Sequence, residues 1–175
     1  MQKVKDKFQA FLEGDYKVKT GYLWSIQQAN KPPWAKIVWS RLSLPKHSFT
    51  ARLLMHSKLP ILQRIGRFLQ LSSQQCTTCH QVEETQHHLF FECQFAQQIW
   101  TQFQQDWGVK IHSAEMGQYV QSLTKLQMPR RMRGVIYSMV STIIYNIWMV
   151  RNKTMFKESS FPVNRILREE KKQVI

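Results

Sequence analysis

Residues 76–93 read CTTCHQVEETQHHLFFEC, and they contain all three cysteines of this 175-residue chain. Together with one histidine they give the spacing Cys76-x2-Cys79-x8-His88-x4-Cys93. Three thiolates and one imidazole are a common closed ligand set for tetrahedral Zn²⁺, and a Cys-x2-Cys turn directs both of its thiolates at one ion. A closed set leaves no position for a reacting water. The sequence therefore predicts one structural zinc ion and argues against a metalloenzyme.

The histidine ligand has a competitor in the neighbouring His87. We favour His88 because its H-x4-C spacing is also that of retroviral-type zinc knuckles. Residues 94–100 resemble a helix start, whose positive end would help to hold the Cys93 thiolate. Three unrelated buried cysteines are the alternative interpretation. The odd cysteine count and the absence of a secretory signal argue against disulfides.

The composition is that of a basic folded protein. Hydrophobic residues make up 43% of the chain, with six tryptophans and ten phenylalanines, which suits one domain or two small ones sharing a core. The formal net charge is +14 and the pI is near 10.0. Such a charge predicts a nucleic-acid partner. An anionic membrane, or a basic surface that serves only solubility, is the alternative.

One uncharged stretch, residues 134–150, resembles a short membrane span flanked by arginines. It has 17 residues and carries Ser138, Ser141, Thr142 and Asn146, whereas a spanning helix needs about 20 mostly apolar residues. We therefore expect a buried core helix and no membrane partner. The N-terminus has no apolar signal core, so we expect an intracellular protein, nuclear or cytoplasmic.

The rest of the chain reads as helices. Residues 8–19 look extended, and Thr20 can cap a following helix. Further helices are expected from Trp34 to Leu42, around residues 49–57, from Pro60, from Gln94 to Trp107, from Ser113, over residues 131–157, and from Val163 to the end. The fold class is mainly α: a helical domain with one Cys3His zinc knuckle and at most a short β segment near the N-terminus.

We expect three regions in this fold. Residues 1–33 form an entry strand and helix, residues 34–108 a helical zinc-binding core, and residues 109–175 a helical extension packed on that core. Leu89-Phe90-Phe91 is expected to be a short buried piece of the zinc segment. The residues expected on the inner side of the helices include Trp34, Trp39, Trp100, Trp148, Ile61, Ile65, Phe68 and Leu69.

Several segments resemble, in order, the zinc-binding domain that follows the reverse transcriptase of plant non-LTR (LINE-type) retrotransposons. Residues 14–22 resemble the family's entry motif, G-x-[FY]-S-V-K-S-A-Y, and residues 34–39 resemble W-x-x-[IL]-W with one extra residue before the second Trp. Residues 83–93 match E-E-T-x-x-H-L-F-x-x-C. This last register assigns His88 as the ligand. Residues 147–152, IWMVRN, resemble a helix that precedes the RNase H-like domain in many of these elements.

The resemblance has departures and limits. Ala51 stands where the family usually has Trp, which suggests a divergent copy. We expect this chain to contain neither the polymerase nor the RNase H-like domain of the family. Phosphoryl transfer in those domains needs clustered carboxylates that hold Mg²⁺, whereas Asp6, Asp15 and Asp106 are scattered. We expect no enzyme activity and no small-molecule substrate.

The resemblance and the charge together imply a module that holds template RNA or target DNA beside a polymerase, with structured or single-stranded RNA preferred over duplex DNA. The expected phosphate contacts are Lys46, Arg52, Arg64, Arg67, Arg130, Arg131 and Arg133. His80, Gln74 and Gln75 flank the knuckle and are candidates for contacts with bases or sugar. The alternative is a domesticated fragment that acts as an adaptor between host proteins. A large exposed apolar patch after Gly108 would favour the adaptor, and a continuous basic surface would favour nucleic acid.

Overall fold

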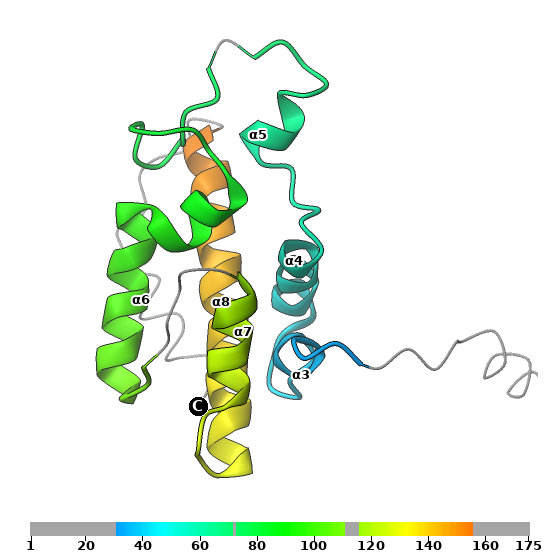
Figure 1. The fold of residues 1–175 in the computed structure, drawn as a ribbon, viewed down its shortest axis with the longest axis vertical. Coiled ribbons are helices and arrows are strands. Elements are labelled where there is room, and N and C mark those ends of the chain that lie inside the picture. Colours follow the sequence, from blue (N-terminus) through cyan, green and yellow to red (C-terminus); the bar gives the residue numbers. More distant parts are fainter. Residues whose placement is uncertain (1–30, 72, 111–115, 156–175) are drawn as a thin grey trace, which may run out of the picture. The chain divides into compact units, whose positions relative to one another are not determined.

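The computed structural model describes residues 31–71, 73–110 and 116–155 (Figure 1). The chain divides into two compact units, residues 1–32 and 33–175, and every element described below belongs to the second. The expected entry strand, the helix capped by Thr20 and the last helix from Val163 lie outside the described residues.

The described residues are mainly helical, as predicted. The elements are α3 (Ala35–Val38), α4 (Pro45–Met55), α5 (Leu62–Ile65), a π-helical turn η1 (His88–Glu92), α6 (Gln94–Trp107), α7 (Met116–Thr124) and α8 (Arg130–Met155). No strand occurs among the described residues. Their β-type pairing is limited to an isolated antiparallel bridge between Gln75 and Glu83.

The helix boundaries follow local chemistry. Pro45 occupies the first position of α4, where its missing N–H costs nothing. Gly108 ends α6 in the left-handed conformation, with φ 61°, which a residue without a Cβ adopts freely. Both predicted bounds of α6 are thereby confirmed.

The long helix α8 is the centre of the fold. It packs along α4 and α3 (Figure 1), and it also contacts η1, which packs against α6. Most side chains from Ile136 to Val150 are buried, so the uncharged stretch is a core helix as predicted. No helix among the described residues is long and apolar enough to cross a membrane.

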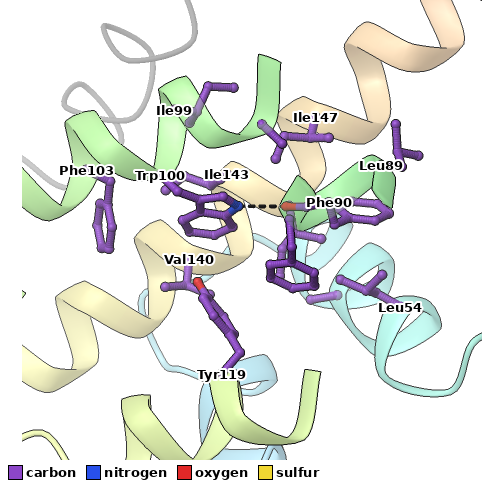
Figure 2. Close-up of a cluster of buried hydrophobic side chains, with 14 of the residues drawn as sticks. Leu54, Leu89, Phe90, Ile99, Trp100, Phe103, Tyr119, Val140, Ile143 and Ile147 are labelled. Carbon is purple, nitrogen blue, oxygen red and sulfur yellow. Dashed lines mark hydrogen bonds between the residues drawn. The ribbon is translucent and has the colours of Figure 1, made fainter. Parts of the chain in front are cut away.

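Aromatic side chains fill the core between η1, α6, α7 and α8 (Figure 2). The Trp100 indole N–H donates to the carbonyl of Phe90 over 2.7 Å, which satisfies a polar group that burial would otherwise leave unpaired. Phe91 stacks on Trp100, and Tyr119 contacts both rings. The predicted burial of Leu89, Phe90 and Phe91 is confirmed.

Three aromatic or apolar positions were predicted wrongly. Trp39 is 56% exposed, Phe68 82% and Leu69 58%, although each was expected to face the core. The reason is that α3 ends at Val38 instead of Leu42, and α5 ends at Ile65. The helical face on which these predictions rested therefore stops before the residues in question.

The chain does not continue as a helix after Val38, because the segment that follows is hydrogen-bonded to α8. The Ser40 hydroxyl donates to the carbonyl of Gly134 over 3.0 Å, and the Ser138 hydroxyl donates to the carbonyl of Leu42 over 2.9 Å. These tertiary bonds override a local helical preference that amounts to tenths of a kcal/mol per residue.

His47 is buried in α4 against α8. The Thr142 hydroxyl donates to the carbonyl of Ser138, so the His47 Nδ1–H must donate to the Thr142 oxygen over 3.0 Å. Its other ring nitrogen, Nε2, is buried without a partner in the described structure. Burial, assisted by the charge of Lys46, lowers the pKa of His47 from 6.5 to about 4. The ring is therefore neutral in the folded protein.

We predict that His47→Asn, which keeps a donor near Nδ1 but cannot titrate, weakens the pH dependence of stability. A histidine with a lowered folded pKa loses stability as the pH falls below 6.5, because the unfolded chain takes up the proton first. Between pH 7 and pH 5 the wild type should lose about 1–2 kcal/mol more free energy of unfolding than the variant. Urea unfolding at both pH values measures this, and parallel pH profiles would contradict it. Zinc release at low pH affects both proteins alike.

Candidate metal centre

The first ligand pair lies on a short turned loop. Gln75 forms an isolated antiparallel β-bridge with Glu83, and the Cys76 amide donates to the carbonyl of Val82 over 2.7 Å. The chain then turns back on itself, because the His80 amide donates to the carbonyl of Cys76 over 2.8 Å. His80 takes a left-handed φ of 56° to do so. This turn holds Cys76 and Cys79 on the same side of the loop.

The second pair is set by the π-helical turn. The Cys93 amide donates to the carbonyl of His88 over 2.7 Å, a bond that spans five residues. The H-x4-C spacing is therefore the spacing of this turn, which places the two ligands side by side. The Thr85 hydroxyl accepts from the His88 amide over 3.0 Å and so fixes the start of the turn. Cys93 then caps α6.

The four side chains converge. The ligand atoms of Cys76, Cys79, His88 and Cys93 all lie within 4.8 Å of one another. The Cys79 Sγ and His88 Nε2 are 3.3 Å apart, whereas ligand atoms around tetrahedral Zn²⁺ are about 3.5–3.8 Å apart. Cys76, Cys93 and His88 are buried, and Cys79 is half-buried. The donor set fits one zinc ion in a closed, structural site.

His88, and not His87, belongs to the group. His88 directs Nε2 at the cluster, while its Nδ1 lies 3.9 Å from a Glu92 carboxylate oxygen. A carboxylate behind a ligating imidazole is the usual means of fixing the ring orientation. His87 is half-buried and pairs instead with Glu92, over 3.3 Å from its Nε2. Of the two histidines that the sequence offers as the fourth ligand, His88 is the one that lies with the three cysteines.

The cluster stabilises the thiolate of Cys76. Hydrogen bonding from the Cys93 side chain and from the backbone near Cys79 and Thr78 lowers the pKa of Cys76 to about 4, despite its burial. The pKa of Cys93 is raised, first by that same shared hydrogen bond and then by burial, while the Phe95 amide at the start of α6 opposes the rise. That amide supplies the helix-terminus stabilisation expected from the sequence.

A buried ion pair joins the zinc loop to α8. Glu84 is fully buried, and the Nη2 of Arg151 donates to its Oε1 over 2.7 Å. The same carboxylate accepts from the Leu62 amide over 2.8 Å and from the Thr77 hydroxyl over 3.3 Å. The Arg151 guanidinium also lies 5.0 Å from the Trp148 ring centroid. One side chain between the two ligand pairs thus contacts α8, the start of α5 and the knuckle.

Three of the predicted phosphate contacts meet in one cleft. Arg130, Arg131 and Arg133, at the start of α8, line a cleft with Lys36 and Arg41 from α3 and the segment after it. None of the described residues that line it is acidic. Lys36, Arg41 and Trp39 were not predicted from the sequence, because only the packing of α3 on α8 brings residues almost a hundred positions apart together.

The other predicted contacts lie elsewhere. Arg64 and Arg67 line a second pocket with the exposed Phe68, and Arg64 Nη1 donates to the carbonyl of Ser57 over 2.6 Å. Lys46 lies 5.0 Å from the ring centroid of Tyr145. Arg52 lies 6.0 Å from that of Trp39, and so adjoins one of the cleft residues. The knuckle residues named from the sequence, His80, Gln74 and Gln75, are exposed.

The comparison with known families agrees with this geometry. The family model described as zinc-binding in reverse transcriptase matches residues 16–100, which include all four ligands. This stretch of the chain is therefore similar to that family. The family is one of zinc-binding domains and not of catalytic ones. The matched residues include α3, α4, α5, the zinc loop with η1, and the first half of α6. No curated protein and no solved structure matches the chain.

We predict one zinc ion per chain, lost in His88→Gln and in Cys93→Ser and retained in His87→Gln. Removing one ligand leaves three donors, which weakens zinc binding and takes away the folding free energy that zinc binding supplies. Elemental analysis after exhaustive dialysis measures the stoichiometry, and circular dichroism follows the helix content. Full zinc occupancy in Cys93→Ser, or its loss in His87→Gln, would contradict the ligand assignment.

We predict that Arg151→Met lowers the stability of the zinc-loaded protein by about 3–5 kcal/mol, because it leaves the Glu84 carboxylate buried without a counter-charge. Glu84→Gln alone should also destabilise. The double variant should lose clearly less than the sum of the two single losses. Urea unfolding of all four proteins tests this, and additive losses would show that the two groups do not interact.

Proposed function

We propose that this chain is a non-catalytic, zinc-stabilised nucleic-acid-binding module of a retrotransposon-derived reverse transcriptase polyprotein, of the plant LINE type. In this role it holds template RNA or target DNA within the cell. The family match supports the association with reverse transcriptase. The observation that carries the binding role is the cleft at the start of α8, whose lining among the described residues includes five cationic side chains and no carboxylate.

The charge of the described surface is unevenly distributed. Glu83, Glu84 and Glu92 all belong to the zinc loop, and Asp106 lies near the end of α6. None of them forms an ion pair with a cation of the cleft in the described residues. Gathering like charges around one cleft costs folding free energy, which phosphate groups of a nucleic acid would offset on binding.

Zinc has an indirect role in this proposal. The metal fixes the loop between Cys76 and Cys93, and Glu84 within that loop holds Arg151 of α8. The same helix carries the cleft arginines at its other end. Zinc would thus support the helix that presents the phosphate contacts without itself touching the nucleic acid.

The adaptor alternative has less support. A large exposed apolar patch after Gly108 would favour it. Among the described residues beyond Gly108, the large exposed apolar side chain is Met132, which lies among the arginines of α8. A protein partner is therefore an outcome of the experiment below and not the proposed function.

We predict that the zinc-loaded protein binds a labelled RNA hairpin with an affinity that falls steeply as salt rises. Arg130→Gln with Arg131→Gln should reduce the slope of log K against log salt by about one unit for each phosphate that the variant no longer neutralises. Fluorescence anisotropy across a salt series measures both quantities. The matched control is Lys58→Gln with Lys110→Gln, which removes the same charge from exposed positions outside the cleft.

Two results would contradict the proposed function. One is the absence of binding at micromolar protein in low salt, which would redirect the search to a protein partner. The other is an equal loss of affinity in both double variants, which would mean that net charge alone, and not the cleft, attracts the RNA.

A further inference from the structure

The cleft at the start of α8 contains an aromatic side chain that its charge does not explain. It has a volume of about 1130 Å³ and is bounded by α3 with the segment after it, by the end of α7 and by the first two turns of α8. Trp39 stands on its border and is 56% exposed, although tryptophan is among the costliest side chains to leave in water.

Trp39 is held in place by its neighbours. The residue after it, Ser40, is bonded to the carbonyl of Gly134, and the carbonyl of Leu42 accepts from Ser138. The Arg52 guanidinium lies 6.0 Å from the Trp39 ring centroid, a cation–π contact from α4. The backbone that carries the ring is thus anchored by the end of α3 before it and by these bonds after it. An exposed ring on an anchored backbone can receive a planar group with little loss of conformational entropy.

The other polar residues that the structure describes in the cleft, Ser40, Thr124 and Tyr137, add no negative charge. Burial raises the pKa of Tyr137, although nearby Arg133 opposes the rise, so the phenol is neutral at physiological pH. The first turn of α8 carries no acidic residue. Its free amides contribute partial positive charge of their own, in addition to that of the three arginines.

We propose that this cleft binds an unpaired, single-stranded segment of nucleic acid, with phosphates on Lys36, Arg41 and the α8 arginines and one base stacked on Trp39. This inference rests on the proposed function and adds the structural class of the ligand. An exposed aromatic ring within a basic groove is the combination that single strands use, because their bases are free to stack. In a duplex the base faces are already covered by their neighbours.

An acidic protein segment is the competing occupant of such a cleft. It would satisfy the cations, but it offers carboxylates in place of a large planar ring for Trp39. The single strand satisfies both features together, so the structure favours it.

The experiment compares three labelled probes of about 12 nucleotides: a pyrimidine single strand, the same strand with abasic sites throughout, and a duplex. Anisotropy titrations at fixed salt are run with the wild type and with Trp39→Ala, Trp39→Phe and Phe68→Ala. Phe68 is the matched control, because it is an exposed aromatic residue that lines the other pocket. Circular dichroism and zinc content confirm that each variant is folded.

We expect the single strand to bind more tightly than the duplex. Trp39→Ala should weaken single-strand binding about 5- to 150-fold, the range for the loss of one base stack. Trp39→Phe should retain part of the affinity, and Phe68→Ala should retain all of it. Because an abasic strand has no base to stack, Trp39→Ala should bind it as well as the wild type does.

A salt series separates the two kinds of interaction. Trp39→Ala should lower the affinity equally at every salt concentration, since stacking releases no counterions. Arg131→Gln should instead reduce the salt slope by about 0.7 for a single strand. A smaller slope in Trp39→Ala would mean that the tryptophan supports the arginines and is not a stacking surface.

The outcomes distinguish this inference from the proposed function. If Trp39→Ala leaves single-strand affinity unchanged while Arg131→Gln weakens it, or if the duplex binds best, the single-strand proposal is overturned and nucleic-acid binding stands. If no probe binds the wild type in low salt, both proposals fall together and the acidic protein segment becomes the candidate.

Discussion

The arrangement of this fold depends on one buried carboxylate. Glu84 has no exposed surface, and a charge in that position is tolerated only when it is paired and hydrogen-bonded. Its partners are Arg151 of α8, the Leu62 amide at the start of α5 and the Thr77 hydroxyl between the first two zinc ligands. Any movement of the zinc loop relative to α8 would break the pair, so the carboxylate fixes the register between them.

Metal and core then reinforce each other. The turn η1 carries the ligand His88 next to Leu89, Phe90 and Phe91, all of them buried, and it packs against α6 and α8. The Phe91 ring also contacts Tyr119 of α7. One short turn therefore contributes to both the metal site and the apolar core. Because the ligands must lose their protons to bind metal, zinc binding, thiolate formation and burial of these apolar residues are coupled steps of folding.

The sequence predicts the parts of this structure that are local. The four zinc ligands, the bounds of α6 and the burial of residues 134–150 each follow from spacing, an end signal or the absence of charge within a short window. The exposure of Trp39 and Phe68 does not, because it depends on where α3 and α5 stop. For α3 that point is set by hydrogen bonds to Gly134 and Ser138, almost a hundred residues away. The sequence also contains Glu84 in the motif of residues 83–93 and Arg151 in that of residues 147–152, but nothing in it indicates that the two side chains pair.

The separation between the metal centre and the basic cleft follows from electrostatics. A Cys3His site with three thiolates around Zn²⁺ carries a net negative charge, and Glu83 and Glu92 add to it on the solvent side. A phosphate backbone near that surface would be repelled. The cations of the cleft instead lie where α3 meets the first turns of α8. They are separated in sequence from every acidic residue that the structure describes. A helix of 26 residues spans about 39 Å. It can therefore be fixed by Arg151 beside the zinc loop near its C-terminal end and present arginines to an anion at the other.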